Sequence, residues 1–295
     1  MTNVRTVAWP APAEVAKPVA LSDLPRHHPG GMVLDRCFRE MTRKRDRDVV
    51  RAEYKADKYA SALAFARSLP EPDPFAVRMF EFGQSGSDEW CFSRGNDLYR
   101  APLADIQTEF DALLVERVLA KAAGCATIVE TGCGYGYNLW RLSRSAPDRA
   151  YIGGDLAETA AELGSHLFAA SKQVRVEVFD YYEPTYDLLA AAEGPVLVYT
   201  CHSIEQLPSA KSFVDGLSRH AEKIAGVVQL EPVYEVHDDT LIGCLRRAYA
   251  DSVDYNRDLL GLLQNRSDIV VHAVEPNVFG INPLNPTTYI HWSFR

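Results

Sequence analysis

The six cysteines of this chain form no Cys-x-x-Cys pair and no compact cluster with histidine. Their spacing argues against a zinc ribbon and against a dense disulfide framework, and it favours a reducing compartment. No stretch of about 18 apolar residues without charges occurs, and the N-terminus lacks the continuous apolar segment of a secretory signal. The sequence therefore predicts a cytoplasmic protein that neither spans a membrane nor is secreted by that route.

Positive charge is also scarce, with 31 Lys and Arg against 40 Asp and Glu and a net charge of −9. Proteins that grip a nucleic-acid backbone normally carry a strongly basic surface, so nucleic acid is not an expected partner. One basic run, at residues 43–51, is interrupted by Asp46 and Asp48 and is typical of a solvated helix face. The remaining composition is that of an ordinary globular protein, 47% hydrophobic over 295 residues.

Residues 1–101 are interpreted as an N-terminal arm followed by a mainly helical cap segment. Prolines recur through residues 10–29 and favour an extended arm, and a helix is expected over residues 39–69, before a proline-rich break. A loop-rich aromatic stretch with Trp90, Phe92 and Tyr99 follows. These rings either form part of a lid or acceptor pocket, or simply pack the segment.

Residues 102–295 are interpreted as a second unit with an α/β fold. Apolar residues on one stripe predict a helix after Pro102 that Gly124 closes. Short apolar runs then alternate with helical stretches, which is typical of βαβ units around a mostly parallel sheet. The last two runs are separated only by a loop, so they are expected to pair antiparallel. Strands are predicted at Thr127–Glu130, Ala150–Asp155, Val174–Phe179, Pro195–Thr200, Gly226–Glu231, Ile269–Glu275 and Thr288–Phe294.

The most informative segment joins the first predicted strand to a helix through three glycines spaced by two. It reads Glu130-Thr131-Gly132-Cys133-Gly134-Tyr135-Gly136-Tyr137. Glycines at such a turn let the backbone approach a ligand closely. The dinucleotide pattern G-x-G-x-x-G would need glycine at position 137, where this chain has tyrosine.

This E-x-G-x-G-x-G segment resembles the first motif of the class I (Rossmann-like) S-adenosylmethionine-dependent methyltransferases, and the resemblance spans about residues 103–295. It implies a seven-stranded mixed sheet with an antiparallel last strand, flanked by helices, and S-adenosylmethionine as cofactor. It also implies that Glu130 helps hold the methionine ammonium group, that Gly132, Gly134 and Gly136 pass beside the cofactor, and that Asp155 binds the ribose hydroxyls. The alternative for Asp155 is a helix N-cap.

Further cofactor-site candidates follow the other predicted strands. In the resembling family an acid after the third strand often receives the adenine amino group, which implies that role for Asp180; a turn or cap is its alternative. Leu156, Tyr181 and Thr200 are expected at the same edge. The loop after the fourth strand has an acid shortly before Leu-Pro, as in the family, but carries Gln206 where a histidine is frequent.

Two residues are candidates for catalysis. His202 would lie beside the cofactor, where a neutral imidazole can remove an acceptor proton, although a packed histidine explains it equally. Glu231 is the second candidate, for acceptor binding or base work. The run at residues 237–239 is interpreted as a helix start and not a metal site.

The sequence thus predicts methyl transfer to an oxygen or nitrogen of a small molecule, such as a sugar or natural-product intermediate, or of a modified peptide. Three alternatives stay open: aminopropyl transfer on the same scaffold, a nicotinamide-dependent oxidoreductase, and a methyltransferase-like domain that binds without turnover. The acceptor, the methylated atom and the oligomeric state are left undetermined by the sequence.

Overall fold

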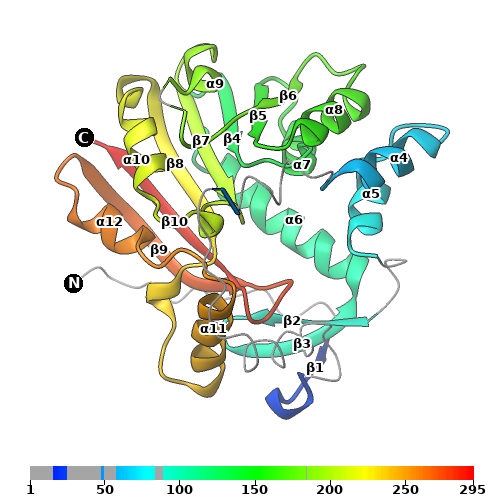
Figure 1. Cartoon of the computed structure of the whole chain (residues 1–295), viewed down its shortest axis with the longest axis vertical. Coiled ribbons are helices and arrows are strands. Elements are labelled where there is room, and N and C mark those ends of the chain that lie inside the picture. Colours follow the sequence, from blue (N-terminus) through cyan, green and yellow to red (C-terminus); the bar gives the residue numbers. More distant parts are fainter. Residues whose placement is uncertain (1–15, 25–47, 50–57, 84–88, 184) are drawn as a thin grey trace.

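The computed structural model describes residues 16–24, 48–49, 58–83, 89–183 and 185–295 (Figure 1). Its centre is a seven-stranded sheet in the order β6-β5-β4-β7-β8-β10-β9, in which β10 alone runs opposite to the other six strands. The mixed sheet with a reversed last strand confirms the predicted fold. The strands are β4 (Thr127–Thr131), β5 (Ala150–Asp155), β6 (Val174–Val178), β7 (Val196–Cys201), β8 (Ile224–Glu231), β9 (Ile269–Phe279) and β10 (Thr287–Phe294).

Helices cover both faces of this sheet because its central strands are apolar on both sides. Ile128 and Tyr199 face one core, whereas Val129 and Val198, one position away in each strand, face the other. The first core is covered by α6 (Leu103–Leu119), α7 (Tyr137–Ser145) and α8 (Glu158–Leu167), and the second by α9 (Asp187–Ala190), α10 (Lys211–Ser218) and α12 (Leu259–Asn265).

Helix α6 follows its predicted stripe, and it lies between the main sheet and the smaller sheet below it (Figure 1). Ile106, Phe110 and Leu114 are among its buried residues. The helix ends at Leu119, with Ala120 as its C-cap, so Gly124 does not close it as predicted. Gly124 has a φ of 76° and lies in the turn that leads to β4 instead.

The segment before α6 contains more strand than the sequence interpretation allowed. Its described part holds α4 (Ala60–Ser68), α5 (Pro74–Glu81) and a three-stranded antiparallel sheet of β1 (Lys17–Pro18), β2 (Glu89–Arg94) and β3 (Asp97–Pro102). The stretch read as a loop is thus a hairpin. A helix was predicted over residues 39–69. Its last part is observed as α4, whereas residues 39–47 and 50–57 lie outside the described residues.

One buried arginine ties this hairpin to the rest of the molecule. Arg246, in α11 (Leu241–Ser252), donates to the carbonyls of Gly95 and Pro283 at 2.8 and 3.0 Å and to Asn96 Oδ1 at 2.7 Å. Ser93 and Gly280 exchange two backbone hydrogen bonds of 2.9 Å alongside. The small sheet is therefore joined to the loop between β9 and β10.

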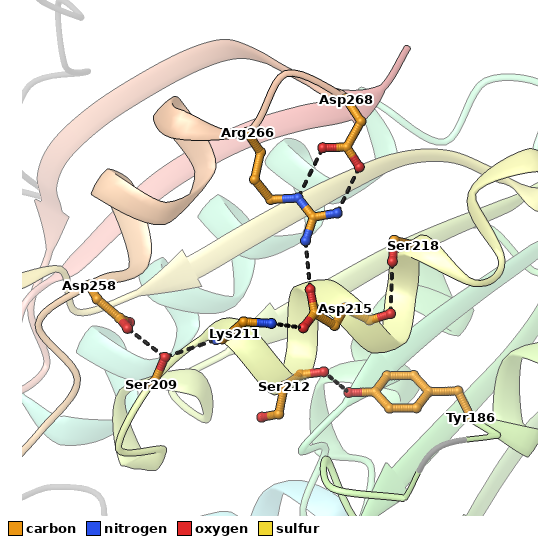
Figure 2. A network of polar contacts seen from close by, with 9 residues as sticks. All are labelled: Tyr186, Ser209, Lys211, Ser212, Asp215, Ser218, Asp258, Arg266 and Asp268. Atoms are coloured by element: carbon orange, nitrogen blue, oxygen red, sulfur yellow. Dashed lines mark hydrogen bonds and ion pairs between the residues drawn. The ribbon is translucent and has the colours of Figure 1, made fainter.

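On the other side of the sheet a more exposed polar network fastens α10 to the segment between α12 and β9 (Figure 2). Arg266 reaches Asp215 of α10 at 2.7 Å and forms two bonds to Asp268, of 3.0 and 2.7 Å. Ser209 donates to Asp258 at 2.5 Å before α10 begins. Because the arginine and both aspartates retain solvent exposure, each contact contributes little to stability.

Short 3-10 helices complete the described elements: η1 (Leu21–Asp23), η2 (Ile204–Gln206), η3 (Ala221–Lys223) and η4 (Tyr234–Val236). In the part of the chain that the structure describes, no helix has the length and apolar character needed to cross a membrane.

Candidate functional site

A cavity of about 600 Å³ opens at the carboxyl ends of β4, β5, β6 and β7. Its floor includes the glycine turn after β4, and its walls include Asp155, Asp180 and His202 from the neighbouring strand ends. Side chains from α5, α6 and the loop after β9 line it as well. In an open sheet with parallel strands this edge is the usual place for a ligand.

The glycine turn lets other atoms come close to its backbone. Some of these atoms belong to the protein itself. A Cβ on Gly132 would collide with Ser203 and with the Tyr181 hydroxyl. Gly132 and Gly134 line the cavity, whereas Gly136 does not. Gly136 has a φ of 88° and caps α7, where a Cβ would meet Val176. The third glycine therefore serves helix packing and not the cavity wall.

Asp155 lies between the glycine turn and the start of α8, although the N-cap residue of that helix is Ala157. Its carboxylate accepts from the N–H of Gly134 at 2.8 Å and from the N–H of Ala157 at 3.0 Å, so it links the glycine turn to the start of α8. It also lines the cavity, beside Leu156, although only 4% of the residue is exposed. Burial raises the pKa of its carboxyl, and the two N–H donors oppose that shift.

Asp180 and Tyr181 follow β6 and line the same cavity. Asp180 Oδ1 accepts from the N–H of Tyr182 at 2.9 Å, which is the turn role considered for it, and the residue is still partly exposed. The Tyr181 hydroxyl and Ser203 Oγ are 2.5 Å apart. This contact bridges the loops that follow β6 and β7.

Glu130 lies behind the cavity and is not part of its lining. The side chain is fully buried, and its carboxyl accepts from Asn138 Nδ2 and from the Tyr199 hydroxyl, both at 2.7 Å. Burial raises its pKa to about 8. The neighbour that does reach the cavity is Asn138, so a contact from Glu130 to a ligand would have to pass through that amide.

Glu231 and Thr200, two further residues predicted for the site, also lie outside the cavity lining. Glu231 is fully buried and accepts from the N–H groups of Ser203 and Ile204 at 2.9 and 3.1 Å. Burial and the adjacent Glu231 carboxylate raise the pKa of Glu205 well above its usual range. These two hydrogen bonds let Glu231 hold the loop after β7 in place.

His202 lines the cavity, as expected, and does so from a strained backbone position with a φ of 50°. Its Nε2 lies 2.7 Å from Thr287 Oγ1, and its ring meets Phe110 edge to face at 6.3 Å. Burial, helped by the charge of Arg78, lowers its pKa to about 4. The imidazole is therefore neutral at physiological pH and only weakly basic.

The cavity also contains residues that no motif indicated. Arg78 and Glu81 come from α5, and Tyr59 precedes α4. These side chains reach the site only because α4 and α5 pack against α8 and α7, and no local pattern in the sequence carries that information. Of Trp90, Phe92 and Tyr99 only Trp90 lines the cavity, while Phe92 is buried against Phe279.

The polar run at residues 237–239 lies away from the cavity, before α11. Thr240 caps that helix by accepting from the N–H of Gly243 at 3.2 Å, and Arg247 binds the carbonyls of His237 and Asp238. Within the described residues no group of three or more His, Cys, Asp or Glu side chains is arranged to hold a metal ion.

No protein-family model matches the chain, and a search of curated proteins finds no match. Similar solved structures include magnesium protoporphyrin IX methyltransferase from Synechocystis PCC 6803 with bound S-adenosylhomocysteine, at 11% identity and a TM-score of 0.49, over 85% of this chain and 100% of that one. Another is geranyl diphosphate C-methyltransferase from Streptomyces coelicolor A3(2), at 14% identity and a TM-score of 0.46, over 66% of this chain and 81% of that one.

A third is an O-methyltransferase from neocarzinostatin biosynthesis in complex with S-adenosylmethionine, at 18% identity and a TM-score of 0.41, over 84% of this chain and 70% of that one. These identities are too low to transfer an activity. The strand order with a reversed β10, and the glycine turn that leads from β4 into α7, give this chain a Rossmann-like fold.

Proposed function

We propose that the chain is an S-adenosylmethionine-dependent methyltransferase that acts on an oxygen or nitrogen of a small molecule or a modified peptide. The observation that carries the proposal is the convergence of Asp155 and Asp180, from the ends of paired strands, on one cavity beside the glycine turn. An adenosine group offers ribose hydroxyls and an adenine amino group as donors. Carboxylates at these two positions supply acceptors for both.

The residues present fit this cofactor chemically. Each oxygen of a carboxylate has two acceptor positions, and Asp155 uses one on each oxygen for a backbone N–H, so capacity for ribose hydroxyls remains. Phe179 and Tyr181, whose rings meet edge to face at 5.2 Å, offer apolar surface for the adenine ring. When bound, the cofactor supplies an electrophilic methyl group on a sulfonium.

The acceptor would occupy the other part of the cavity, under the segment that precedes α6. We assign residues 1–101 as the acceptor-side unit and 102–295 as the cofactor-binding unit. Phe82 and Trp90, an edge-to-face pair at 5.6 Å, line this part together with Phe110. Aromatic walls exclude water from the site and favour a flat apolar acceptor. Asn282 and Asn285 add donors and acceptors that can orient it.

His202 would position the acceptor more than it would remove its proton. A base with a pKa near 4 takes a proton poorly from a hydroxyl or amine, but a neutral imidazole still accepts or donates a hydrogen bond. Most of the rate enhancement would then come from aligning the acceptor with the methyl group.

The direct test incubates the purified full chain with a cell extract and S-adenosylmethionine that carries a heavy methyl label. Untargeted mass spectrometry is expected to find at least one low-molecular-weight or peptide product with the label, absent from the Asp155→Ala reaction. Saturable binding of NADH at micromolar concentration, with none of S-adenosylhomocysteine, would replace this proposal with an oxidoreductase. Cofactor binding without any labelled product would favour a non-catalytic domain.

A further inference from the structure

S-adenosylmethionine, the cofactor of the proposed function, carries a free amino-acid group. The structure offers residues other than Glu130, the acid at the end of β4, to bind this group. A free amino-acid group presents a carboxylate and an ammonium, so it needs a cation and an anion close together. Glu130 is enclosed behind the cavity by Asn138 and Tyr199. Its raised pKa, about 8, also means that it carries little charge at neutral pH.

Arg78 and Glu81 supply the opposite charges on the cavity surface. They stand one helical turn apart on α5, with Arg78 Nη1 3.6 Å from Glu81 Oε2. That separation leaves the ion pair loose. Arg78 donates from Nε to Gln107 at 3.3 Å, and its terminal nitrogens make no hydrogen bond to any residue in the described ranges. Those nitrogens are the ones that can hold a carboxylate through two parallel bonds.

The Arg78 guanidinium is held in position by aromatic rings and by a buried chain of hydrogen bonds. Its carbon lies 4.9 Å from the centre of the Phe82 ring and 5.6 Å from that of Tyr137. Gln107, which is fully buried, donates in turn to Asp111 at 2.7 Å. Asp111 also accepts from the Tyr137 hydroxyl at 2.7 Å. Such support fixes the guanidinium before any ligand arrives.

The placement of this pair relative to the adenosine side is also suitable. Tyr137, on which Arg78 stacks, is the first residue of α7 and follows the glycine turn directly. Asp155 binds the N–H of Gly134 in the same turn. The charged pair and the proposed ribose acceptor therefore lie beside one short turn of the backbone.

From this geometry we propose that α5 holds the amino-acid end of S-adenosylmethionine, with Arg78 binding its carboxylate and Glu81 its ammonium. The inference rests on the proposed function and moves recognition of the amino-acid group from β4 to the segment that precedes α6. It also makes cofactor binding depend on that segment being docked.

The test compares three ligands by calorimetric titration: S-adenosylhomocysteine, its analogue without the α-amino group, and 5′-methylthioadenosine, which lacks the whole amino-acid group. Arg78→Met is expected to weaken the first two by about 10- to 100-fold, the scale for losing a charged hydrogen-bond partner, and to leave the third unchanged. Glu81→Gln is expected to weaken only the first. Arg78→Lys, which keeps the charge but not the fork, is expected to lie between wild type and Arg78→Met.

Arg175→Met is the control, because the exposed Arg175 side chain pairs with Glu177 on β6 and does not line the cavity. It is expected to bind all three ligands as wild type does, and thermal melts establish that each variant is folded. The assignment would be overturned if Arg78→Met bound S-adenosylhomocysteine as tightly as wild type does, or if it lost as much affinity for 5′-methylthioadenosine. In either case, binding of S-adenosylhomocysteine by the wild type would still support the proposed function. If the wild type binds none of the three, the proposed function falls together with this inference.

Discussion

At the scale of single residues, polar groups that line the cavity also hold neighbouring segments of the fold together. Asp155 joins the glycine turn to α8 through two backbone N–H groups and still faces the cavity. Ser203 Oγ donates to the Thr131 carbonyl at 3.2 Å and also meets Tyr181. Substitutions at such positions therefore have to be judged by binding and by stability separately.

His202 gives a prediction that needs no substrate. Because burial lowers its pKa to about 4, its imidazole signals are expected not to titrate between about pH 5.5 and 8. NMR spectra of the wild type over this range, with His202→Asn to assign the signals, provide the measurement. A midpoint near the ordinary histidine value of about 6.5 would show a solvated ring and return His202 to the role of a base.

Gly132 is expected to tolerate no side chain. Its φ is 72°, and a Cβ there would overlap Ser203 and Tyr181. Gly132→Ala should lower the free energy of unfolding by about 1–3 kcal/mol, as overpacking does, in urea titrations. Gly261→Ala is the control, since the nearest atom to its Cβ would be Glu235 Oε1 at 3.7 Å. An equal free energy of unfolding for the two variants would show that the loop after β7 can move to make room for the added methyl group.

At the scale of elements, the hairpin β2–β3 is held by a buried cation, whereas α10 is held by an exposed network. Arg246 is fully buried and binds groups of the hairpin and of the loop after β9, and burial lowers its pKa to about 10. Arg266 makes three side-chain hydrogen bonds, to Asp215 and Asp268, but remains partly exposed (Figure 2). Arg246 should therefore contribute much more to the free energy of unfolding than Arg266.

Replacing each arginine by methionine tests that difference. Arg246→Met leaves the buried Pro283 carbonyl and the partly buried Gly95 carbonyl without their donor, at a cost of about 1–3 kcal/mol in the free energy of unfolding. Arg266→Met should cost less than about 1 kcal/mol, as exposed ion pairs do. Urea unfolding of both variants gives the comparison. A larger loss for Arg266→Met would contradict the ranking.

At the scale of the whole molecule, the enclosed Glu130 links stability to pH. Its pKa of about 8 in the folded state exceeds the usual carboxyl value, so the folded chain binds more protons than the unfolded chain between about pH 4.5 and 8. The stability that this proton contributes is complete below that window and is lost as the pH rises through about 8. Glu130→Gln has no such proton to lose.

The free energy of unfolding of wild type should accordingly fall, relative to that of Glu130→Gln, between about pH 4.5 and 8 and level off above that. Urea titrations at several pH values in this window measure the difference. A constant difference across the window would mean that Glu130 is ionised in the folded protein, and its enclosure by Asn138 and Tyr199 would then need another explanation.

The local sequence pattern was sufficient to predict the main sheet, because apolar runs and glycine turns each involve only residues that are close together in the sequence. Strand β9 runs past its predicted end through Pro276 because it lies at the edge of the sheet, where a missing N–H is tolerated. The hairpin was missed although Gly95-Asn96 between two aromatic stretches is a known two-residue connection. The sequence thus contained a hairpin signal, but the stretch was interpreted as an aromatic loop.

The candidate site was predictable only where strands deliver residues to the sheet edge. Asp155, Asp180 and His202 lie at the cavity for that reason. Glu231 also ends a strand, yet it turns inward because the N–H groups of the loop after β7 need an acceptor. Arg78 reaches the cavity through packing of α5 on α7, a contact between distant segments that no spacing in the sequence reveals.

The central claim is that Asp155 helps bind the adenosyl group of S-adenosylmethionine, and a calorimetric titration of S-adenosylhomocysteine tests it most directly. Wild type is expected to bind one equivalent, and Asp155→Ala to bind about 1–3 kcal/mol more weakly while remaining folded. Absence of binding to the folded wild type, or equal affinity of the two proteins, would contradict the account.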